Sequence, residues 1–214
     1  MGNKELYIIG ASGFAREVRD WVEQCGFTVS AFIDPALEGA IVDGLPVLKD
    51  EQTLLTRLKG KKLNFVIGIG SPKIRKRIVE ELNNYSEVVF PNILCPDVVF
   101  GKNVKIEEDS GVILCPGNVL TTNIILKQHV VVNLSCTIGH DCILEDYVML
   151  SPGCNLSGKV NVGEGSYLGT GSTILEELEI GSRVTVGAQA AVVKSVPNDV
   201  TVVGVPAKTI GTRQ

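Results

Sequence analysis

Aromatic residues are scarce in this sequence, and charge of one sign is not concentrated anywhere in it. Of the 214 residues, 5% are aromatic and 44% are hydrophobic, so aliphatic side chains must build the core. The formal net charge is −4, and no basic cluster occurs. This charge pattern argues against nucleic acid or an anionic membrane surface as a partner.

Long apolar runs are also missing. No run reaches about 18 residues, so we expect no membrane span. The first residues, MGNKELYIIGASG, lack the apolar stretch and small-residue cleavage site of a signal peptide. We therefore expect a cytoplasmic protein. Its six cysteines, none of them in a CxxC pair, are then expected to be thiols rather than disulfides.

The first 90 residues alternate strand and helix patterns. The patterns predict strands at 6–9, 29–33, 65–70 and 88–90, and helices at 14–25, 51–58 and 72–82. Strands that alternate with helices indicate a small parallel sheet. We therefore predict a Rossmann-like α/β domain over residues 1–90.

From about Val98 the sequence follows a six-residue period. Aliphatic residues recur at every sixth position from Leu120 to Val192, and a second inward residue, usually small or β-branched, lies four positions after most of them. Each hexapeptide is one short strand plus a turn, and three close a triangular coil of roughly 18 residues. We therefore predict a parallel β-helix over residues 91–214.

The phase of this period changes once. Phe100, Ile106 and Val112 keep the six-residue spacing but do not align with the later positions. We interpret the difference as an insertion of about two residues near Pro116.

A glycine turn follows the first predicted strand and begins the first predicted helix. In Gly10-Ala11-Ser12-Gly13, free N–H groups at the helix start can bind a phosphate. Asp34 lies about 20 residues further on, where a ribose-binding acid is expected. A tight turn without a ligand is the alternative. An NAD enzyme is not expected, because 90 residues supply only one mononucleotide-binding half.

The third predicted strand ends on the same edge of the sheet. It leads into Gly68-Ile69-Gly70-Ser71, and Arg75 follows in the next helix. We predict that Gly70 belongs to the same candidate ligand site as the glycine turn and that Arg75 faces a diphosphate.

Only two histidines occur, His129 and His140. His140 occupies an outward position of its hexapeptide and precedes Asp141, and imidazole suits a general base because its pKa is close to working pH. An exposed turn histidine without a role is the alternative. His129 lacks a carboxylate neighbour, so we expect it at the surface. Two histidines also fall short of the three that a zinc carbonic anhydrase of β-helical fold needs, so we expect no metal.

Catalysis by a cysteine nucleophile is the alternative to a histidine general base. Cys136 and Cys142 lie close to His140 in the sequence, but both occupy inward positions of their hexapeptides. We therefore predict that these thiols pack in the core, where burial makes them unreactive.

Three motifs together resemble a known family. The closing segment Gly204-Val205-Pro206-Ala207-Lys208 after the repeats is similar to that of the hexapeptide acyltransferases. The glycine turn with Asp34, the run Asn133-x6-His140-Asp141-Cys142 and the triplet Ser151-Pro152-Gly153 resemble a narrower group. This group contains the bacterial nucleotide-sugar acetyltransferases of bacillosamine and perosamine type and the sialic acid O-acetyltransferases. The resemblance covers essentially the whole chain.

The resemblance implies a left-handed β-helix and a homotrimer with its active sites between subunits. It implies acetyl-CoA as co-substrate, a nucleotide-sugar acceptor in bacterial surface-glycan synthesis, and His140 as general base oriented by Asp141. The acceptor-binding residues are then Gly10, Ser12, Gly13, Asp34, Gly70 and Asn133. The acetyl-CoA-binding residues are then Met149, Gly158, Gly169, Gly187, Pro206 and Lys208.

Two positions depart from the family pattern. Met149 stands where the family often has a histidine that hydrogen-bonds near the thioester, and Phe14 stands where several members have a histidine after the glycine turn. A donor to the acetyl carbonyl and one sugar contact are therefore missing or replaced. Two alternatives stay open: a sugar O-acetyltransferase, and a nucleotide-sugar-binding scaffold or sensor with impaired catalysis.

Overall fold

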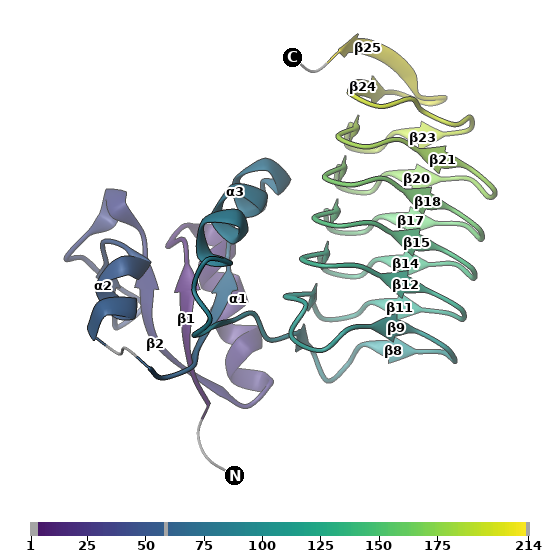
Figure 1. The fold of residues 1–214 in the computed structure, drawn as a ribbon. Helices are drawn as coiled ribbons and strands as arrows, with labels where there is room; N and C mark the ends of the chain where they lie inside the picture. The colour runs from purple at the N-terminus through teal and green to yellow at the C-terminus, as the bar shows by residue number, and fades with distance from the viewer. Residues whose placement is uncertain (1–3, 58–59, 213–214) are drawn as a thin grey trace.

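The structure, a computed structural model, describes residues 4–57 and 60–212. An α/β lobe comes first in the chain, and a tall triangular β-helix follows it (Figure 1). Helix α3 of the lobe runs beside the coils, and the C-terminal strands close the far end of the β-helix (Figure 1). No helix within the described ranges is both long and apolar enough to cross a bilayer.

The lobe is a six-stranded sheet with helices. Its elements are β1 (Lys4–Ile9), α1 (Gly13–Gln24), β2 (Phe27–Ile33), a short 3-10 helix (Pro35–Leu37), β3 (Ile41–Val42), β4 (Leu45–Leu48), α2 (Glu51–Arg57), β5 (Leu63–Ile67), α3 (Pro72–Leu82) and β6 (Val88–Val89). The strand order is β3-β4-β2-β1-β5-β6, and all pairs are parallel except β3 with β4. Each predicted strand and helix is confirmed in position, but the third strand ends at Ile67 and not at Gly70, and other ends differ by one or two residues. Leu58, the predicted end of the second helix, lies outside the described residues.

The hairpin of β3 and β4 was not predicted. Its two-residue turn, Asp43-Gly44, has φ of 46° and 80°, which is the backbone that an Asp-Gly hairpin turn requires. The strands are short and irregular in pattern, so the turn was the usable signal. Elsewhere in the lobe, Gly68 permits close packing of α1 on the sheet, because a Cβ there would lie 2.6 Å from the Cα of Ala15.

The β-helix has three faces, each a stack of parallel strands. The first face contains β7 (Ile93–Leu94), β10 (Ile113–Leu114), β13 (Val131–Val132), β16 (Met149–Leu150), β19 (Tyr167–Leu168), β22 (Thr185–Val186), β24 (Val200–Val203) and, antiparallel, β25 (Lys208–Thr212). The second face contains β8 (Val99–Phe100), β11 (Val119–Leu120), β14 (Thr137–Ile138), β17 (Asn155–Leu156), β20 (Thr173–Ile174) and β23 (Ala191–Val192). The third face contains β9 (Lys105–Ile106), β12 (Ile125–Leu126), β15 (Ile143–Leu144), β18 (Asn161–Val162) and β21 (Glu179–Ile180).

The predicted six-residue period is confirmed by the register. Val131 pairs with Met149 and Thr137 with Asn155, so each coil takes 18 residues. Each strand from β11 to β23 has two residues, and the second of them, from Leu120 to Val192, points into the core and is buried. Because anchors stack on anchors, each coil buries the apolar surface of its neighbours.

The predicted position of the insertion is wrong. Lys105 pairs with Ile125, 20 residues away, and β10 begins eight residues after β9. The two extra residues therefore lie between Ile106 and Ile113 rather than near Pro116. Val112, Ile113 and Leu114 are all buried, so hydrophobicity alone does not define the phase there.

The three corners of the β-helix turn at residues with left-handed backbone. The first corner (first to second face) has Gly117, Ser135, Gly153, Gly171 and Gln189; the second (second to third face) has Asn103, Asn123, Asp141, Lys159 and Glu177; the third (third to first face) has Gly111, His129, Tyr147, Gly165 and Arg183. Their φ angles lie between 54° and 76°. Glycine, Asn and Asp tolerate this conformation best.

Arg75 joins the lobe to the β-helix. The residue is 1% exposed, and its guanidinium donates to the carbonyls of Gly70 (2.9 Å) and Tyr147 (2.7 Å). Burial lowers the pKa of Arg75 to about 9. The prediction that Arg75 faces a diphosphate is wrong, because the side chain is buried and backbone carbonyls of both parts of the chain accept from its two terminal nitrogens.

We predict that Arg75→Ala lowers the free energy of unfolding by roughly 2–4 kcal/mol, because it leaves several buried carbonyls without a donor. Arg77→Ala is the matched control on the same helix, since the Arg77 side chain is 70% exposed. We expect the control to change stability by less than about 0.5 kcal/mol. Urea unfolding measures both, and equal effects would contradict the buried role of Arg75.

Candidate active site

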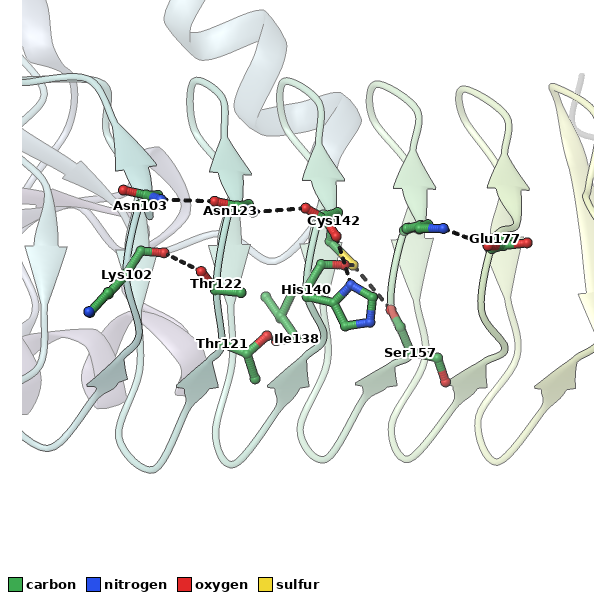
Figure 2. Close-up of polar contacts among 12 residues, drawn as sticks. Lys102, Asn103, Thr121, Thr122, Asn123, Ile138, His140, Cys142, Ser157 and Glu177 are labelled. Atoms are coloured by element: carbon green, nitrogen blue, oxygen red, sulfur yellow. Dashed lines mark hydrogen bonds and ion pairs between the residues drawn. The ribbon is translucent and has the colours of Figure 1, made fainter.

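His140 and Asp141 lie together at the second corner, in the turn between β14 and β15. The His140 Nδ1 atom is 2.7 Å from Asp141 Oδ2. Both side chains are exposed, and Figure 2 shows the His140 ring at the edge of its coil. Asp141 has φ of 60°, a conformation that Asp tolerates.

The charge state of Asp141 decides how the imidazole is used. The hydrogen bond from His140, and after it the one from Asn123, holds the pKa of the Asp141 carboxyl below its usual range. An ionised carboxylate only accepts hydrogen bonds, so Nδ1 of His140 carries the proton. The Nε2 atom of the neutral ring then presents a lone pair, which is the form that a general base needs.

Gly158 makes room for the imidazole. It lies one coil further along the same corner, and a Cβ at Gly158 would come within 2.4 Å of His140 Nε2. Any side chain there would displace the ring. The glycine therefore leaves the reactive nitrogen beside bare backbone.

Cys142 follows Asp141 and points into the core, as predicted. It is fully buried, and its Sγ atom is 3.2 Å from the Ser157 carbonyl oxygen. Burial raises the pKa of the Cys142 thiol. A protonated, enclosed thiol is a poor nucleophile.

A second group of candidate residues lies at the carboxyl edge of β1, β2 and β5. Gly10 has φ of 97°, and a Cβ there would come within 3.0 Å of the Ile69 side chain. Asp34 accepts hydrogen bonds from the N–H groups of Ala11 (3.2 Å) and Ala36 (3.0 Å). This arrangement places Asp34 directly beside the glycine turn.

The start of α1 is open at this edge. Ser12 and Gly13 are exposed, and the Ser12 side chain makes no capping hydrogen bond. The first N–H groups of a 12-residue helix therefore face outward beside Asp34. Such a helix start favours phosphate, and the nearby carboxylate suits a ribose hydroxyl.

A third group of candidate residues lies where strands of the first face end. Asn133, Gly169 and Gly187 occupy equivalent positions of different coils, each directly after a strand of this face. Asn133 is buried, and its Oδ1 atom accepts from the Leu134 N–H at 2.7 Å. A Cβ at Gly187 would lie 2.7 Å from the Val203 side chain, in the hairpin that also carries the exposed Pro206 and Lys208.

The chain matches known proteins along its length. Residues 5–82 match the family described as the PglD N-terminal domain. GDP-perosamine N-acetyltransferase of Escherichia coli O157:H7 is 31% identical over 213 residues, which cover 94% of each chain. The chain belongs to the hexapeptide-repeat nucleotide-sugar acetyltransferases.

Solved structures agree with the assignment of this chain to the acetyltransferase family. PerB from Caulobacter crescentus, in complex with CoA and GDP-perosamine, has a TM-score of 0.88 and 30% identity, with 99% of this chain and 98% of that chain covered. The acetyltransferase domain of PglB from Neisseria gonorrhoeae, in complex with acetyl coenzyme A, has a TM-score of 0.88 and 32% identity, with 98% and 100% covered. The predicted fold, an α/β lobe followed by a left-handed β-helix, is confirmed, as is the assignment to acyltransferases that use acetyl-CoA.

The acetyltransferase chain carries three groups of candidate site residues: His140 with Asp141, the glycine turn with Asp34, and the residues that follow strands of the first face. A single chain does not bring all three together. Arg75 and Phe90 connect the lobe to Tyr147 and His129 of the third corner. Cys25 of the lobe contacts the Leu94 carbonyl of the first face, whereas His140 lies at the second corner. Met149 belongs to the lobe side: it is buried on β16, and its methyl carbon lies 3.9 Å from where a Cβ of Gly70 would be. Its assignment to acetyl-CoA stays a prediction.

A cleft of about 620 Å³ lies between α3 and the third corner, away from His140. Lys76 pairs there with Glu164 at 2.6 Å, and Arg183 pairs with Asp199 at 2.6 Å, so much of its charge is neutralised. Among the residues that the structure describes, no group of three or more His, Cys, Asp or Glu side chains is arranged to hold a metal ion.

Sequence reasoning missed Asn123, which donates to Asp141 at 3.0 Å. The available signal was its position 18 residues, one coil, before Asp141.

The prediction that His129 is a surface residue is wrong. The residue is 5% exposed. Its ring stacks on Tyr147 with ring centroids 5.4 Å apart, and Phe90 packs edge-on against it at 4.9 Å. Gly111 is needed beside it, because a Cβ there would come within 2.4 Å of the ring. The lobe covers this corner through Phe90, which a hexapeptide pattern does not reveal.

Burial and, after it, the Arg75 guanidinium lower the pKa of His129 to about 4 from its ordinary 6.5. Between pH 6.5 and 4 the unfolded acetyltransferase therefore binds a proton that the folded one does not, so stability falls as pH falls through this window. We predict a loss of up to about 2 kcal/mol between pH 7 and pH 5. Urea unfolding at both pH values measures it, and His129→Asn, which suits the left-handed backbone, should remove most of the dependence. An unchanged dependence in this variant would contradict the assignment.

Proposed function

We propose that this acetyltransferase acetylates the amino group of a nucleoside-diphosphate-linked sugar, with His140 as general base and Asp141 as the residue that orients it. The 2.7 Å contact between His140 Nδ1 and Asp141 Oδ2 carries this proposal. It commits Nδ1 to the carboxylate and leaves Nε2 exposed beside Gly158. The acceptor and acetyl-CoA can then react beside Nε2 of His140.

The chemistry needs no covalent enzyme intermediate. The acceptor nitrogen attacks the thioester carbonyl carbon, a C–N bond forms, and Nε2 of His140 takes the proton that the nitrogen loses. The tetrahedral intermediate then breaks its C–S bond, and the proton passes from Nε2 to the departing sulfur. Met149 has no N–H or O–H donor for the carbonyl oxygen in this step, so we infer that a backbone N–H supplies it.

The choice of an amine over a hydroxyl acceptor rests on the relatives. Two of them, from Escherichia coli and Caulobacter crescentus, are named for GDP-perosamine or for a complex with it, and the first is an N-acetyltransferase. The open helix start at Ser12 and the Asp34 carboxylate support a nucleotide in the lobe of this chain. The sugar would extend from there toward Met149.

We infer a homotrimer in which each active site combines two copies. The lobe and the end of the first face would come from one copy, and His140 with Gly158 from its neighbour. Exposed apolar side chains support a protein contact at the second corner. Leu175 and Val193 are each 41% exposed. They occupy the position of Gly139 in later coils, directly after strands of the second face. The free cysteines agree with a cytoplasmic location, where acetyl-CoA is also available.

We predict that His140→Ala lowers kcat by roughly 10²–10⁴-fold on an amino-sugar nucleotide, the usual value of a positioned base. Acetyl-CoA affinity should change little, because the later coils hold most of the cofactor. Asp141→Asn should cost less, since the imidazole remains. Steady-state kinetics and calorimetry check this. Full turnover by His140→Ala would refute the base assignment, and a wild-type protein that binds acceptor without turnover would indicate a sensor.

We predict a solution mass of three times the 22.9 kDa chain. The reason is that the separated groups of site residues need a second copy to complete each site, and closed rings are the usual form of such contacts. Light scattering coupled to size exclusion measures this mass. A single-chain mass at micromolar concentration under assay conditions would contradict the shared site.

A further inference from the structure

Three side chains form a continuous hydrogen-bond ladder that ends on the predicted base. Asn103 donates through Nδ2 to Asn123 Oδ1 at 3.0 Å, and Asn123 donates through Nδ2 to Asp141 Oδ1 at 3.0 Å. The other carboxylate oxygen of Asp141 faces His140. Figure 2 shows Asn103 and Asn123 on successive coils, with the dashed contacts leading to the coil that carries His140.

The backbone explains why the ladder stands at this corner. Asn103, Asn123 and Asp141 have φ of 59°, 56° and 60°, the left-handed conformation that Asn and Asp adopt more readily than most residues. The register stacks these three positions, and strands in register lie about 4.8 Å apart, which short amide side chains can bridge. Backbone bonds from Asn123 N to Lys102 O and from Asp141 N to Thr122 O, both 3.0 Å, hold the corner residues in line.

The ladder has only one consistent direction. An ionised Asp141 accepts but does not donate, so Asn123 must turn its NH₂ group toward it. The Asn123 carbonyl oxygen then faces Asn103, which must present its own NH₂ group. On the opposite side, Lys159 pairs with Glu177 at 2.8 Å rather than with Asp141. The amides therefore fix one carboxylate oxygen and leave the other for His140.

We propose that Asn123, supported by Asn103, is a positioning residue for catalysis: it aims the Asp141 carboxylate at Nδ1 of His140 and thereby sets the orientation of the base. This inference deepens the proposed function and rests on the role of His140. Neither asparagine touches the reacting atoms. Their effect passes through Asp141 alone.

Two substitutions at Asn123 separate positioning from a structural role. Asn123→Gly removes the donor and keeps the left-handed backbone without strain. We expect it to lower kcat about 10-fold, the value of one hydrogen bond to a charged group, with KM for both substrates near wild type. Asn103→Gly should lower kcat less, by about threefold, because the direct donor remains.

Asn123→Asp is the sharper test. Aspartate suits this corner as well as asparagine does, so a structural role predicts no change. Positioning predicts a kcat loss at least as large as for Asn123→Gly, because the new carboxylate repels Asp141. It also predicts that the acidic limb of the kcat/KM profile moves to higher pH, since added negative charge favours the imidazolium form. The other charged groups along this corner, among them Lys102, Lys159, Glu176 and Glu177, are unchanged in the variant.

Asp109→Gly is the matched control. Asp109 is an exposed residue with φ of 50° in the first coil, away from the second corner, and should leave kcat and the pH profile unchanged. Wild-type kcat and pH profile in Asn123→Asp would overturn the inference, as would a kcat in Asn123→Gly equal to that of the control. If Asn123→Gly does not fold, Asn123→Asp decides alone.

The His140→Ala variant separates this inference from the proposed function. A fully active His140→Ala would overturn both. An inactive His140→Ala together with normal Asn123 variants would overturn only the positioning role of Asn123.

Discussion

The 18-residue register of the β-helix is the constraint on which the rest of the structure depends. It places each residue directly over the one that lies one coil earlier, so every corner is a column of side chains with the same backbone conformation. Contacts between neighbours in a column then build the candidate site. Gly158 leaves room for the His140 ring from one side, and Asn123 holds Asp141 from the other. A β-helix can thus vary its chemistry by exchanging corner residues, while the buried anchors keep the coils in place.

The sequence allowed the main features to be predicted because they are local or periodic. The six-residue pattern predicted the coils, the alternation of strands and helices predicted the lobe, and the outward hexapeptide position predicted an exposed His140. Burial of Cys142 followed from the same pattern. The motif itself indicated a nucleotide site at the glycine turn and Asp34. The assignment of the other site residues to acceptor and cofactor came mainly from family resemblance, and all these roles remain proposals.

The features that the sequence did not reveal depend on contacts between distant segments. His129 looked like a surface residue because its cover, Phe90 and the lobe, lies outside the repeat. Arg75 looked like a phosphate ligand because nothing local shows that carbonyls of the β-helix occupy its guanidinium. The insertion was misplaced because three consecutive apolar residues hide the phase. Asn123 was missed because its partner is one coil away, although the period itself would have pointed to it.

The central claim is that one active site draws its base from one copy and its acceptor lobe from another. The lobe is fastened to the third corner of its own β-helix by Arg75, and the His140 corner of the same chain faces elsewhere. In the proposed assembly, the two halves meet when copies associate.

Mixed assembly tests this claim most directly. A chain with His140→Ala and a chain with an impaired acceptor lobe, Asp34→Ala, would each be assayed alone and then after joint unfolding and refolding in equal amounts. If the site is shared between copies, the inactive chains should together regain up to about a quarter of the wild-type rate, the fraction of interfaces that combine two intact halves. If each chain carries a complete site of its own, the mixture would show no more activity than the two variants alone.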